Sequence, residues 1–444
     1  MTSIANAPFG KRQLWIVIVS SMEQIIGAGL STLAGIIIPM INLLRHPELS
    51  SGLQGLAGAS GLIGIAIGSP IIGRLSDKYG YLFFFRLCPL IIIAGSLLVY
   101  FIDDIGWTIL GLFITGFGVG GGYSLDSAYI SELMPDRWKS TMVGVAKASS
   151  SLGFIGVAAL SYVILKGDPM AKEWPVLALL ITALGIIAFL MRLSWAESPQ
   201  WSYRHKGIAS AQKDLEEFFG NQITFTPPVT SPVVQNNSYW SLFKGENLNR
   251  VIFSGIPWAC EGVGVYGVGV FLPILVMSLG LENSHLSGMP KITESVVLTA
   301  IINCFILVGF VVGILMLSHF KHYKMLVQGF IWATIGLGII LISHLCHFPV
   351  AISLIGFLLF EFFLNIGPHL ITFIIPPKVF APADRAAGNG IAAFLGKVGA
   401  IGGVFLMPWL LKLGGITLVL IVCIGFNLLG ALISAIYGRK LFNE

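Results

Sequence analysis

Charged residues are scarce in this sequence. Only 11% of its 444 residues are Asp, Glu, Lys or Arg, whereas 55% are hydrophobic and the mean hydropathy is +0.87. This balance excludes an ordinary soluble domain and is typical of an integral membrane protein. We attribute the net charge of +5 to membrane topology, and nothing in the sequence favours nucleic-acid binding.

Cysteines and catalytic motifs are also few. The five cysteines lack metal-ligand spacing, and we interpret them as small buried apolar residues. The sequence has no nucleophile elbow, no HExxH and no phosphate-binding glycine loop, so a hydrolase or metalloenzyme is poorly supported. We expect no enzyme activity, no cofactor and no metal. One weak alternative is a metal site at His344, Cys346 and His347, which have no acidic partner nearby in sequence.

Long apolar runs recur from end to end. Each run is long enough to cross about 30 Å of hydrocarbon as a helix, and the alternation of a membrane barrel is lacking. The sequence therefore predicts an all-α membrane protein with 12 transmembrane helices in two six-helix halves. The predicted spans are 14–43, 53–73, 82–101, 106–133, 139–165, 174–195, 249–279, 292–318, 324–345, 348–376, 386–411 and 415–438.

The distribution of basic residues predicts the orientation. Lys11 and Arg12 precede the first run, which has no small-residue cleavage pattern, so we expect a retained helix and a cytoplasmic amino terminus. Few of the 26 Lys and Arg residues fall in loops that this topology puts outside: Arg45, Lys166, Lys172, Lys291 and Lys412. We expect a multi-pass protein of the cell inner (plasma) membrane with both termini in the cytoplasm.

A polar segment at 196–247 divides the predicted spans into two groups, with six spans before it and six after it. We expect an N-terminal bundle over 1–195, a cytoplasmic linker over 196–247 and a C-terminal bundle over 248–444. Within the linker, Ala211, Leu215 and Phe218 repeat at helical spacing. This pattern predicts a short amphipathic helix, with an unstructured linker as the alternative.

The turn IIGRLSDKYG at 71–80 places four charged side chains between two apolar runs. It resembles the G-x-L-x-D-[RK]-x-G signature of the major facilitator superfamily, through Gly73, Leu75, Asp77, Lys78 and Gly80. The resemblance implies that this turn gates the transporter, with the acid latching an outward-facing state. Tyr81 and Leu82 depart from the basic pair that usually follows. A generic basic cytoplasmic turn is the alternative.

Three further segments resemble branches of this superfamily. AESPQW at 196–201 resembles an element of sugar porters, and GGGYSLDSAYISELMP at 120–135 resembles helix 4 of phosphate:proton symporters and synaptic-vesicle-glycoprotein-like carriers. Residues 365–400 resemble phosphate and organic-ion symporters. Gly122 stands where phosphate carriers have an acid, and His369 and Lys378 also differ from the residues usual in that branch. The resemblance therefore does not imply that phosphate is the substrate.

Segments 133–153 and 380–399 share the order Pro, Arg, Gly and then an intramembrane Lys, which supports two related halves. We expect Glu132, Arg137 and Arg385 from these segments to join the turn at 71–80 in gating.

Four acids lie deep in the predicted spans: Glu23, Asp126, Glu261 and Glu361. An acid within hydrocarbon costs at least ~2.5–3.5 kcal/mol, so each is a functional candidate. They fall in helices 1, 4, 7 and 10, which line the central cavity in the superfamily that the chain resembles. We predict that they couple transport to protons. Buried carboxyl groups that brace helices are the alternative.

Polar and aromatic residues near these acids form the predicted substrate site. On the tenth helix, Glu361, Asn365, His369 and Thr372 follow helical spacing and form one polar stripe. His369 is either a proton relay or a hydrogen-bonded core residue. The predicted substrate-binding residues are Gln24, Tyr123, Lys147, Trp258, Tyr266, Asn365, His369 and Lys397.

The predicted spans place two cations fully inside the membrane, Lys147 and Lys397. Each either neutralises an acid, Asp126 being the nearest candidate for Lys147, or holds an anionic substrate.

These patterns predict a monomeric carrier that works by alternating access and imports a small polar metabolite, such as an organic anion or a sugar, with protons. Its partners would be that substrate, protons and the lipid bilayer. The fifth span lacks the G-P-x-x-G kink that drug antiporters usually carry. Proton-driven efflux of organic cations or drugs is the second hypothesis, and a non-transporting membrane sensor is the third.

Overall fold

The computed structural model is helical and describes most of the chain. The described residues are 2–4, 9–44, 48–166, 174–220, 223–226, 242–279, 288–317, 319–380 and 385–441. Within them, the one strand pair is parallel and joins β1 (Thr2–Ser3) to β2 (Ile223–Thr224). The pairing ties the start of the chain to the segment that follows the amphipathic helix.

The helices of the first half of the chain are α1 (Lys11–Val19), α2 (Met22–Leu44), α3 (Ser51–Tyr79), α4 (Tyr81–Phe101), α5 (Ile105–Leu133), α6 (Asp136–Ala148), α7 (Ser150–Leu165), η2 (Trp174–Leu177), α8 (Ala178–Met191), α9 (Pro199–Lys206) and α10 (Ile208–Phe219). Those of the second half are α11 (Gly245–Gly262), the π-helical segment η4 (Val263–Val268), α12 (Leu272–Ser278), α13 (Met289–Met316), α14 (His322–Leu345), α15 (Val350–Ile366), α16 (Pro368–Val379) and α17 (Arg385–Leu441).

The described residues contain 11 helical stretches that are long and apolar enough to cross a membrane. The last of these, Gly390–Leu441, has 52 residues. At about 1.5 Å per residue, it is more than twice as long as ~30 Å of hydrocarbon requires. Its backbone leaves the helical region at Gly414 and Gly415, where Gly415 has a φ of +61°. The stretch is therefore two spans, and the predicted fold of 12 transmembrane helices is confirmed.

Contacts between residues divide the chain into two compact units. Unit 1 comprises Met1–Leu30, Ser60–Gly153 and Pro175–Ser231, and unit 2 comprises Ser31–Ala59, Phe154–Trp174 and Pro232–Glu444. The division into bundles at 195 and 248 stays a prediction.

In unit 1, glycines allow α4 and α5 to approach closely. A Cβ added at Gly95 would lie 2.5 Å from the Thr115 backbone nitrogen, and one at Gly118 would lie 2.8 Å from the Cys88 carbonyl oxygen. Both distances are shorter than side chains tolerate, so the contact requires glycine. This packing fixes α5, which carries Asp126, against α4, which carries Phe85.

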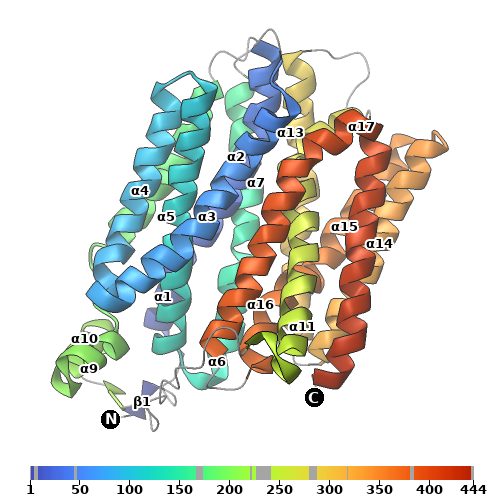
Figure 1. The fold of residues 1–444 in the computed structure, drawn as a ribbon. Helices are drawn as coiled ribbons and strands as arrows, with labels where there is room; N and C mark the ends of the chain where they lie inside the picture. The colour runs from blue at the N-terminus through green and yellow to red at the C-terminus, as the bar shows by residue number, and fades with distance from the viewer. Residues whose placement is uncertain are drawn as a thin grey trace. The chain divides into compact units, whose positions relative to one another are not determined.

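The predicted amphipathic helix corresponds to α10. Ala211, Leu215 and Phe219 form its buried face and belong to the same apolar cluster as Tyr129 and Trp195. Phe218 packs against the edge of this cluster and is partly buried. Figure 1 shows α9 and α10 below the lower ends of α4 and α5.

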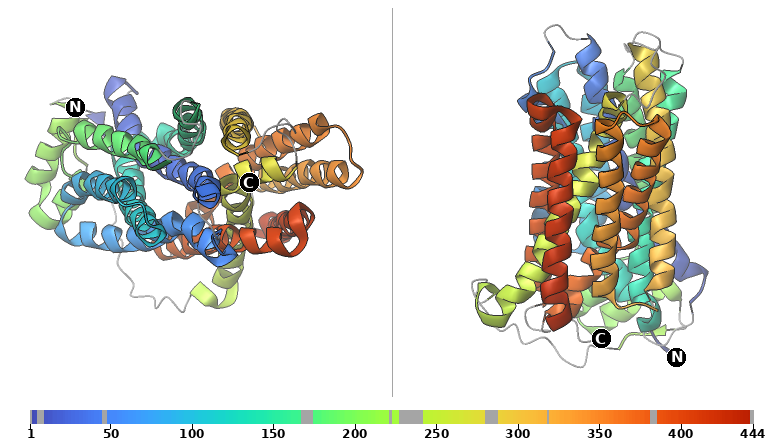
Figure 2. Two further views of the ribbon diagram at one scale, coloured as in Figure 1. Left: turned by 90° about the horizontal axis from the view of Figure 1, so that it is seen from above. Right: turned by 90° about the vertical axis from the view of Figure 1, so that its right-hand side faces the viewer.

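In unit 2, small residues again set the helix contacts. A Cβ at Gly262 would lie 2.7 Å from the Gly396 carbonyl oxygen, which holds α11 against α17. A Cβ at Gly336 would lie 2.8 Å from the Gly356 carbonyl oxygen, which holds α14 against α15. Figure 2 shows the red helix α17 beside the orange helix α14.

Candidate functional site

The four predicted acids are all buried. Glu23 and Asp126 lie in unit 1, and Glu261 and Glu361 lie in unit 2. Their burial agrees with their predicted depth in the spans, and it requires each carboxyl group to find a proton or a partner. Each unit provides partners of its own.

In unit 1, the partner of both acids is Arg192. Its Nη2 donates to Glu23 Oε2 and, over 3.1 Å, to Asp126 Oδ1. Its Nη1 donates to the Phe85 carbonyl oxygen over 3.0 Å. The guanidinium also lies over the Phe85 ring, 3.6 Å from the ring centroid. A fully buried cation is thus fixed by three separate groups.

Arg192 corrects the sequence-based assignment of intramembrane cations. The sequence singled out only Lys147 and Lys397 and grouped Arg192 with the cytoplasmic charges, although it lies inside the predicted span 174–195. The structure buries Arg192 completely at the end of α8, where it pairs with Asp126. The planar guanidinium fork can serve two carboxylates at once, which the single ammonium of Lys147 does less well.

Two carboxylates share one cation at this site, so its formal charge is −1. Within the described part of the chain, Glu23 Oε1 and Asp126 Oδ2 accept no hydrogen bond, and both atoms are buried. One proton added to this cluster would make it neutral.

Gly122 makes this arrangement possible. A Cβ at this position would overlap the Glu23 side chain and lie 2.8 Å from its Oε1 atom. The glycine leaves room on α5 for the carboxyl group that α2 supplies. Phosphate carriers have an acid at the position of Gly122, whereas in this chain α2 supplies an acid, Glu23, to the same space.

The remaining unit 1 candidates lie nearby along these helices. Gln24 follows Glu23 in α2 and is buried. Tyr123 is half-buried in α5, and its hydroxyl occupies the space that a Cβ at Gly27 would take. Lys147 lies half-buried in the last turn of α6.

In unit 2, the polar stripe of the tenth span forms a connected row. Asn365 Nδ2 donates to the Glu361 carbonyl oxygen over 2.7 Å and to Glu361 Oε2 over 3.3 Å. His369 Nδ1 lies 2.7 Å from Asn365 Oδ1, and Thr372 donates to the Pro368 carbonyl oxygen. The row continues across the break at Gly367, where α15 ends and α16 begins.

The other ring nitrogen of His369 faces the second acid. His369 Nε2 lies 3.6 Å from Glu261 Oε1, and Phe310 packs against the imidazole with ring centroids 5.0 Å apart. Because Asn365 Oδ1 accepts from Nδ1–H, Nε2 is an acceptor when the imidazole is neutral. The two groups therefore form an ion pair only when His369 is protonated.

Aromatic and basic groups border this row. The π-helical segment η4 carries the buried Tyr266, and Lys397 Nζ lies 5.3 Å from its ring centroid. Trp258 packs edge-on against Phe373 at 5.8 Å, and a Cβ at Gly396 would lie 2.7 Å from the indole ring. Indole, phenol and ammonium groups beside carboxylates suit a small polar ligand.

The predicted gating turn has partners that the sequence did not reveal. Glu197 Oε1 accepts from the backbone N–H groups of Tyr81, Leu82 and Ser198, at 2.9, 3.1 and 2.9 Å. Gly80 has a φ of +112°, and a Cβ there would lie 2.7 Å from Glu197 Oε2. Glu197 thus satisfies the exposed donors at the start of α4.

Tyr81, noted as a departure from the family pattern, bonds to the gating acid. Its hydroxyl donates to Asp77 Oδ1 over 2.5 Å, and Trp201 Nε1 donates to the Asp77 carbonyl oxygen over 2.9 Å. Lys78 lies over the Tyr79 ring. A phenol therefore binds Asp77 where the resemblance led us to look for a basic residue.

Glu132 lies beyond the apolar stretch Ile105–Asp126 of α5. Its Oε2 accepts from Ser198 Oγ over 2.5 Å and from the Gln200 backbone N–H over 3.4 Å. Desolvation raises the pKa of Glu132 to about 7, although both hydrogen bonds favour the carboxylate. The Glu132 carboxyl group therefore titrates near neutral pH.

The other gating candidates lie on three different helices. Gly73 lies against Ser124, and Arg137 lies over the Trp138 ring at 5.3 Å. Arg385 begins α17, and its side chain lies outside the described ones. Among the described residues, no group of three or more His, Cys, Asp or Glu could hold a metal ion.

Comparison with known proteins agrees with this architecture. A family model described as "Sugar (and other) transporter" matches residues 18–437. The inner membrane metabolite transport protein YgcS of Escherichia coli K12 is 24% identical, over 90% of this chain and 86% of that protein. The repressible high-affinity phosphate permease of Neurospora crassa is also 24% identical, over 90% of this chain and 78% of its own length.

Solved structures share the fold. The inward open xylose transporter XylE of Escherichia coli matches with a TM-score of 0.77 at 16% sequence identity, over 97% of this chain and 96% of that chain. The D-xylose-proton symporter structure matches with a TM-score of 0.75, also at 16% identity, over 95% of this chain and 97% of that one.

Proposed function

Because this chain belongs to the sugar (and other) transporter family, we propose that it imports a small polar metabolite together with protons. It is a membrane transporter with the major facilitator fold and not an enzyme. Proton coupling, import and the roles of individual residues are the proposal. Alternating access would expose the proton sites to each side of the membrane in turn.

One observation carries the proposal: the buried cluster of Glu23, Asp126 and Arg192 has a formal charge of −1. A proton bound there makes the cluster neutral, and its release restores the charge. Moving a neutral site through a low-dielectric environment is easier than moving a charged one. Protonation of this cluster would therefore permit a conformational change that the ionised form resists.

The row in unit 2 supports a second role, in which substrate and proton meet. Glu261 and His369 face each other over 3.6 Å and would bind the proton here, and Asn365 links His369 to Glu361. Tyr266 and Lys397 border this row with a phenol ring and a cation. We assign substrate binding to this region, and sugars, organic anions and phosphate are the candidate classes.

Efflux of organic cations is less well supported. That hypothesis needs ionised acids free to bind a cation, whereas Arg192 occupies both carboxyl groups of unit 1. In unit 2, His369 faces one acid and Asn365 donates to the other. These partners reduce the negative charge available to a cationic substrate.

We further propose that the protein is a monomer in the cell inner (plasma) membrane, with both termini in the cytoplasm. The biased distribution of Lys and Arg supports this orientation. The name of the bacterial relative YgcS places that protein in an inner membrane, which agrees with the proposed location.

The first test identifies the substrate class. Purified protein in detergent would be screened for thermal stabilisation by sugars, organic anions, inorganic phosphate and amine drugs at pH 5.5 and 7.5. We expect stabilisation by a sugar or an anion, stronger at pH 5.5. Stabilisation by amines alone, stronger at pH 7.5, would contradict import and favour efflux.

The second test uses the identified compound in proteoliposomes with an imposed pH gradient. Asp126→Asn removes the titratable group but keeps its size, so we expect gradient-driven accumulation to be lost while exchange of labelled for unlabelled substrate continues. Asp103→Asn, at an exposed carboxylate between α4 and α5, is the matched control and should accumulate normally. Undiminished accumulation by D126N would exclude Asp126 as the coupling residue. Binding without flux would instead favour a sensor.

A further inference from the structure

Arg86 is the one charged residue in the sequence of α4, and it binds the end of α8. Its Nε donates to the Arg192 carbonyl oxygen over 3.1 Å. Its Nη2 donates to the carbonyl oxygens of Leu193 and Trp195 over 2.7 and 3.0 Å. The last carbonyl groups of a helix have no partner within it, and a cation beside them also complements the helix dipole. Arg86 therefore fixes the main chain where α8 ends.

Arg192 is bonded to two consecutive residues of α4. Its carbonyl oxygen accepts from Arg86, and its Nη1 donates to the Phe85 carbonyl oxygen over 3.0 Å. Its Nη2 reaches Glu23 and Asp126, whereas its Nε donates to nothing within the described part of the chain. Because the side chain has a limited length, the place of the guanidinium between the two acids depends on where the main chain of Arg192 is held.

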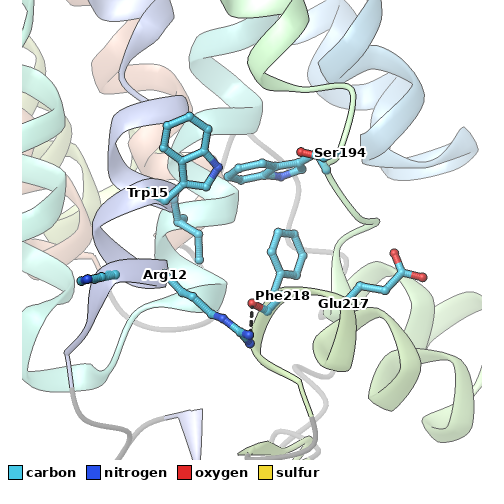
Figure 3. A pocket seen from close by; sticks show the side chains of 8 residues that line it. Arg12, Trp15, Ser194, Glu217 and Phe218 are labelled. Atoms are coloured by element: carbon cyan, nitrogen blue, oxygen red, sulfur yellow. Dashed lines mark hydrogen bonds between the residues drawn. The ribbon is translucent and has the colours of Figure 1, made fainter.

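The segment from Arg192 to Glu197 returns to α4 at its other end. Glu197 accepts from the first two backbone N–H groups of α4, and Tyr129 donates to the Ala196 carbonyl oxygen over 3.1 Å. In between, Ser194 lines a cavity of about 290 Å³ that α1 and the end of α10 also border (Figure 3). Since packing is incomplete there, the segment depends on direct bonds, and Arg86 makes three of them.

Given the proposed role of the charge cluster in proton binding, on which this assignment rests, we propose that Arg86 is a positioning residue of the proton site. It fixes the main chain at Arg192 and thereby holds the Arg192 guanidinium between Glu23 and Asp126. Without Arg86, the two acids would lose part of their counter-charge, and the folded protein would bind a proton more readily at neutral pH. Stability would then fall as the pH rises, because the folded state would hold more protons than the unfolded state.

Few other groups can contribute to a pH dependence at this site. Within the described part of the chain, the charged and titratable groups that face the two acids are Arg192 from α8 and the Cys88 thiol from α4. Neither changes charge between pH 5.5 and 8, since a guanidinium stays protonated and a buried thiol stays neutral. Glu132 does titrate near neutral pH, and its partner Ser198 directly follows the segment that Arg86 binds. The pH response of the buried cluster must therefore be separated from that of Glu132.

The test compares unfolding temperatures of the full-length protein in detergent at pH 5.5 and 8, followed by tryptophan fluorescence. Arg86→Gln removes all three bonds, and we expect a loss of about 3 °C at pH 5.5 and of about 5 °C or more at pH 8. A guanidinium that only caps α8 keeps its charge throughout this range, so its removal would cost the same at both pH values. The pH-dependent excess is therefore specific to the positioning of Arg192.

A double-mutant comparison assigns this excess to Arg192. In an R192Q background the guanidinium to be positioned is gone, so R86Q should there cost the same at pH 5.5 and at pH 8. An excess that persists in this background would arise elsewhere, for example at Glu132, and would contradict the proposal. If R86Q or the double variant does not fold, R86K, which keeps the charge but not the planar fork, replaces R86Q in both comparisons.

Two control variants are matched to R86Q. Arg12→Gln also removes a guanidinium that donates to a main-chain oxygen, but this oxygen belongs to Phe218 in α10, 3.3 Å away (Figure 3). Tyr129→Phe removes the bond to the Ala196 carbonyl oxygen, at the far end of the segment that Arg86 binds. Both variants should lower the unfolding temperature by about 3 °C or less, and equally at the two pH values.

Equal losses at pH 5.5 and 8 in both R86Q and R86K would overturn the proposal and leave Arg86 as a cap of α8. Such a result would not affect proton-coupled import, which D126N tests in proteoliposomes. Conversely, normal accumulation by D126N would exclude Asp126 as the coupling residue, while the unfolding temperatures would still decide whether Arg86 positions Arg192.

Discussion

Replacing Arg192 by glutamine should destabilise the protein strongly and in a pH-dependent way. The substitution removes both ion pairs, the bond from Nη1 to the Phe85 carbonyl oxygen and the contact with the Phe85 ring. Breaking a buried ion pair by removing one partner typically costs 3–5 kcal/mol. At roughly 2 °C per kcal/mol for a large chain, the unfolding temperature should fall by about 6–10 °C.

The sign of the pH dependence follows from charge. In R192Q, Glu23 and Asp126 are buried without a cation, so each must bind a proton to remain in place. Protons are bound more readily by the folded than by the unfolded state, and stability therefore falls as the pH rises. The loss at pH 8 should exceed the loss at pH 5.5.

The buried cysteines allow the unfolding temperature to be measured. Cys88, Cys260 and Cys423 are buried as expected, whereas Cys304 and Cys346 are exposed, so the expectation of burial is wrong for these two. In a C304S/C346S background, a thiol-reactive fluorogenic dye would report unfolding as the three buried thiols become accessible. This background should first be shown to unfold at the same temperature as the unmodified protein.

Two further variants make the reasoning refutable. Adding Glu23→Gln to R192Q removes one of the two unpaired acids and should recover part of the stability, most of all at high pH. Arg250→Gln breaks an exposed pair with Glu246 and should shift the unfolding temperature by about 1 °C or less. If R192Q unfolds at the same temperature as its parent at pH 8, the buried ion pairs contribute nothing.

Two other predictions concern single contacts. The raised pKa of Glu132, about 7 against an ordinary 4.5, means that the folded state binds this proton more tightly, so its contribution to stability is lost as the pH rises from 4.5 to 7. Glu132→Gln should flatten this part of the curve of unfolding temperature against pH, whereas the exposed Glu246→Gln should not; identical slopes would contradict the assignment. Gly122→Ala should cost roughly 1–3 kcal/mol, because the new methyl group overlaps the Glu23 side chain, and an unchanged unfolding temperature would contradict this packing. Gly156→Ala, where an added Cβ would meet no described atom within 4 Å apart from its own helix backbone, is the control and should be neutral or stabilising.

The helices could be predicted because their signal is local. Apolar runs of about 20 residues in a row leave a membrane span as the main solution, and the break between the last two spans falls at Gly414 and Gly415, close to the predicted gap. The row from Glu361 to His369 also followed from spacing alone, because residues four apart lie on one helix face.

Contacts between helices could not be predicted in this way. Arg192 is more than 60 residues from Asp126 in sequence. It lies near the cytoplasmic end of its predicted span, where basic residues are expected, so no feature of the sequence separated it from the cytoplasmic charges. The pairing of Glu261 with His369 likewise joins α11 to α16. In both cases the sequence identified the acid, while its partner depends on packing that periodicity does not describe.

The space at Gly122 bears on how related carriers should be compared. An alignment by columns would record a lost acid at this position and infer a lost function. The Glu23 side chain, however, passes through the volume that a side chain at 122 would occupy. In this chain a carboxyl group thus occupies that volume, and α2 supplies it rather than α5. Searches for proton sites among these carriers should therefore compare the positions of carboxyl groups in superposed structures rather than residue identities in aligned columns.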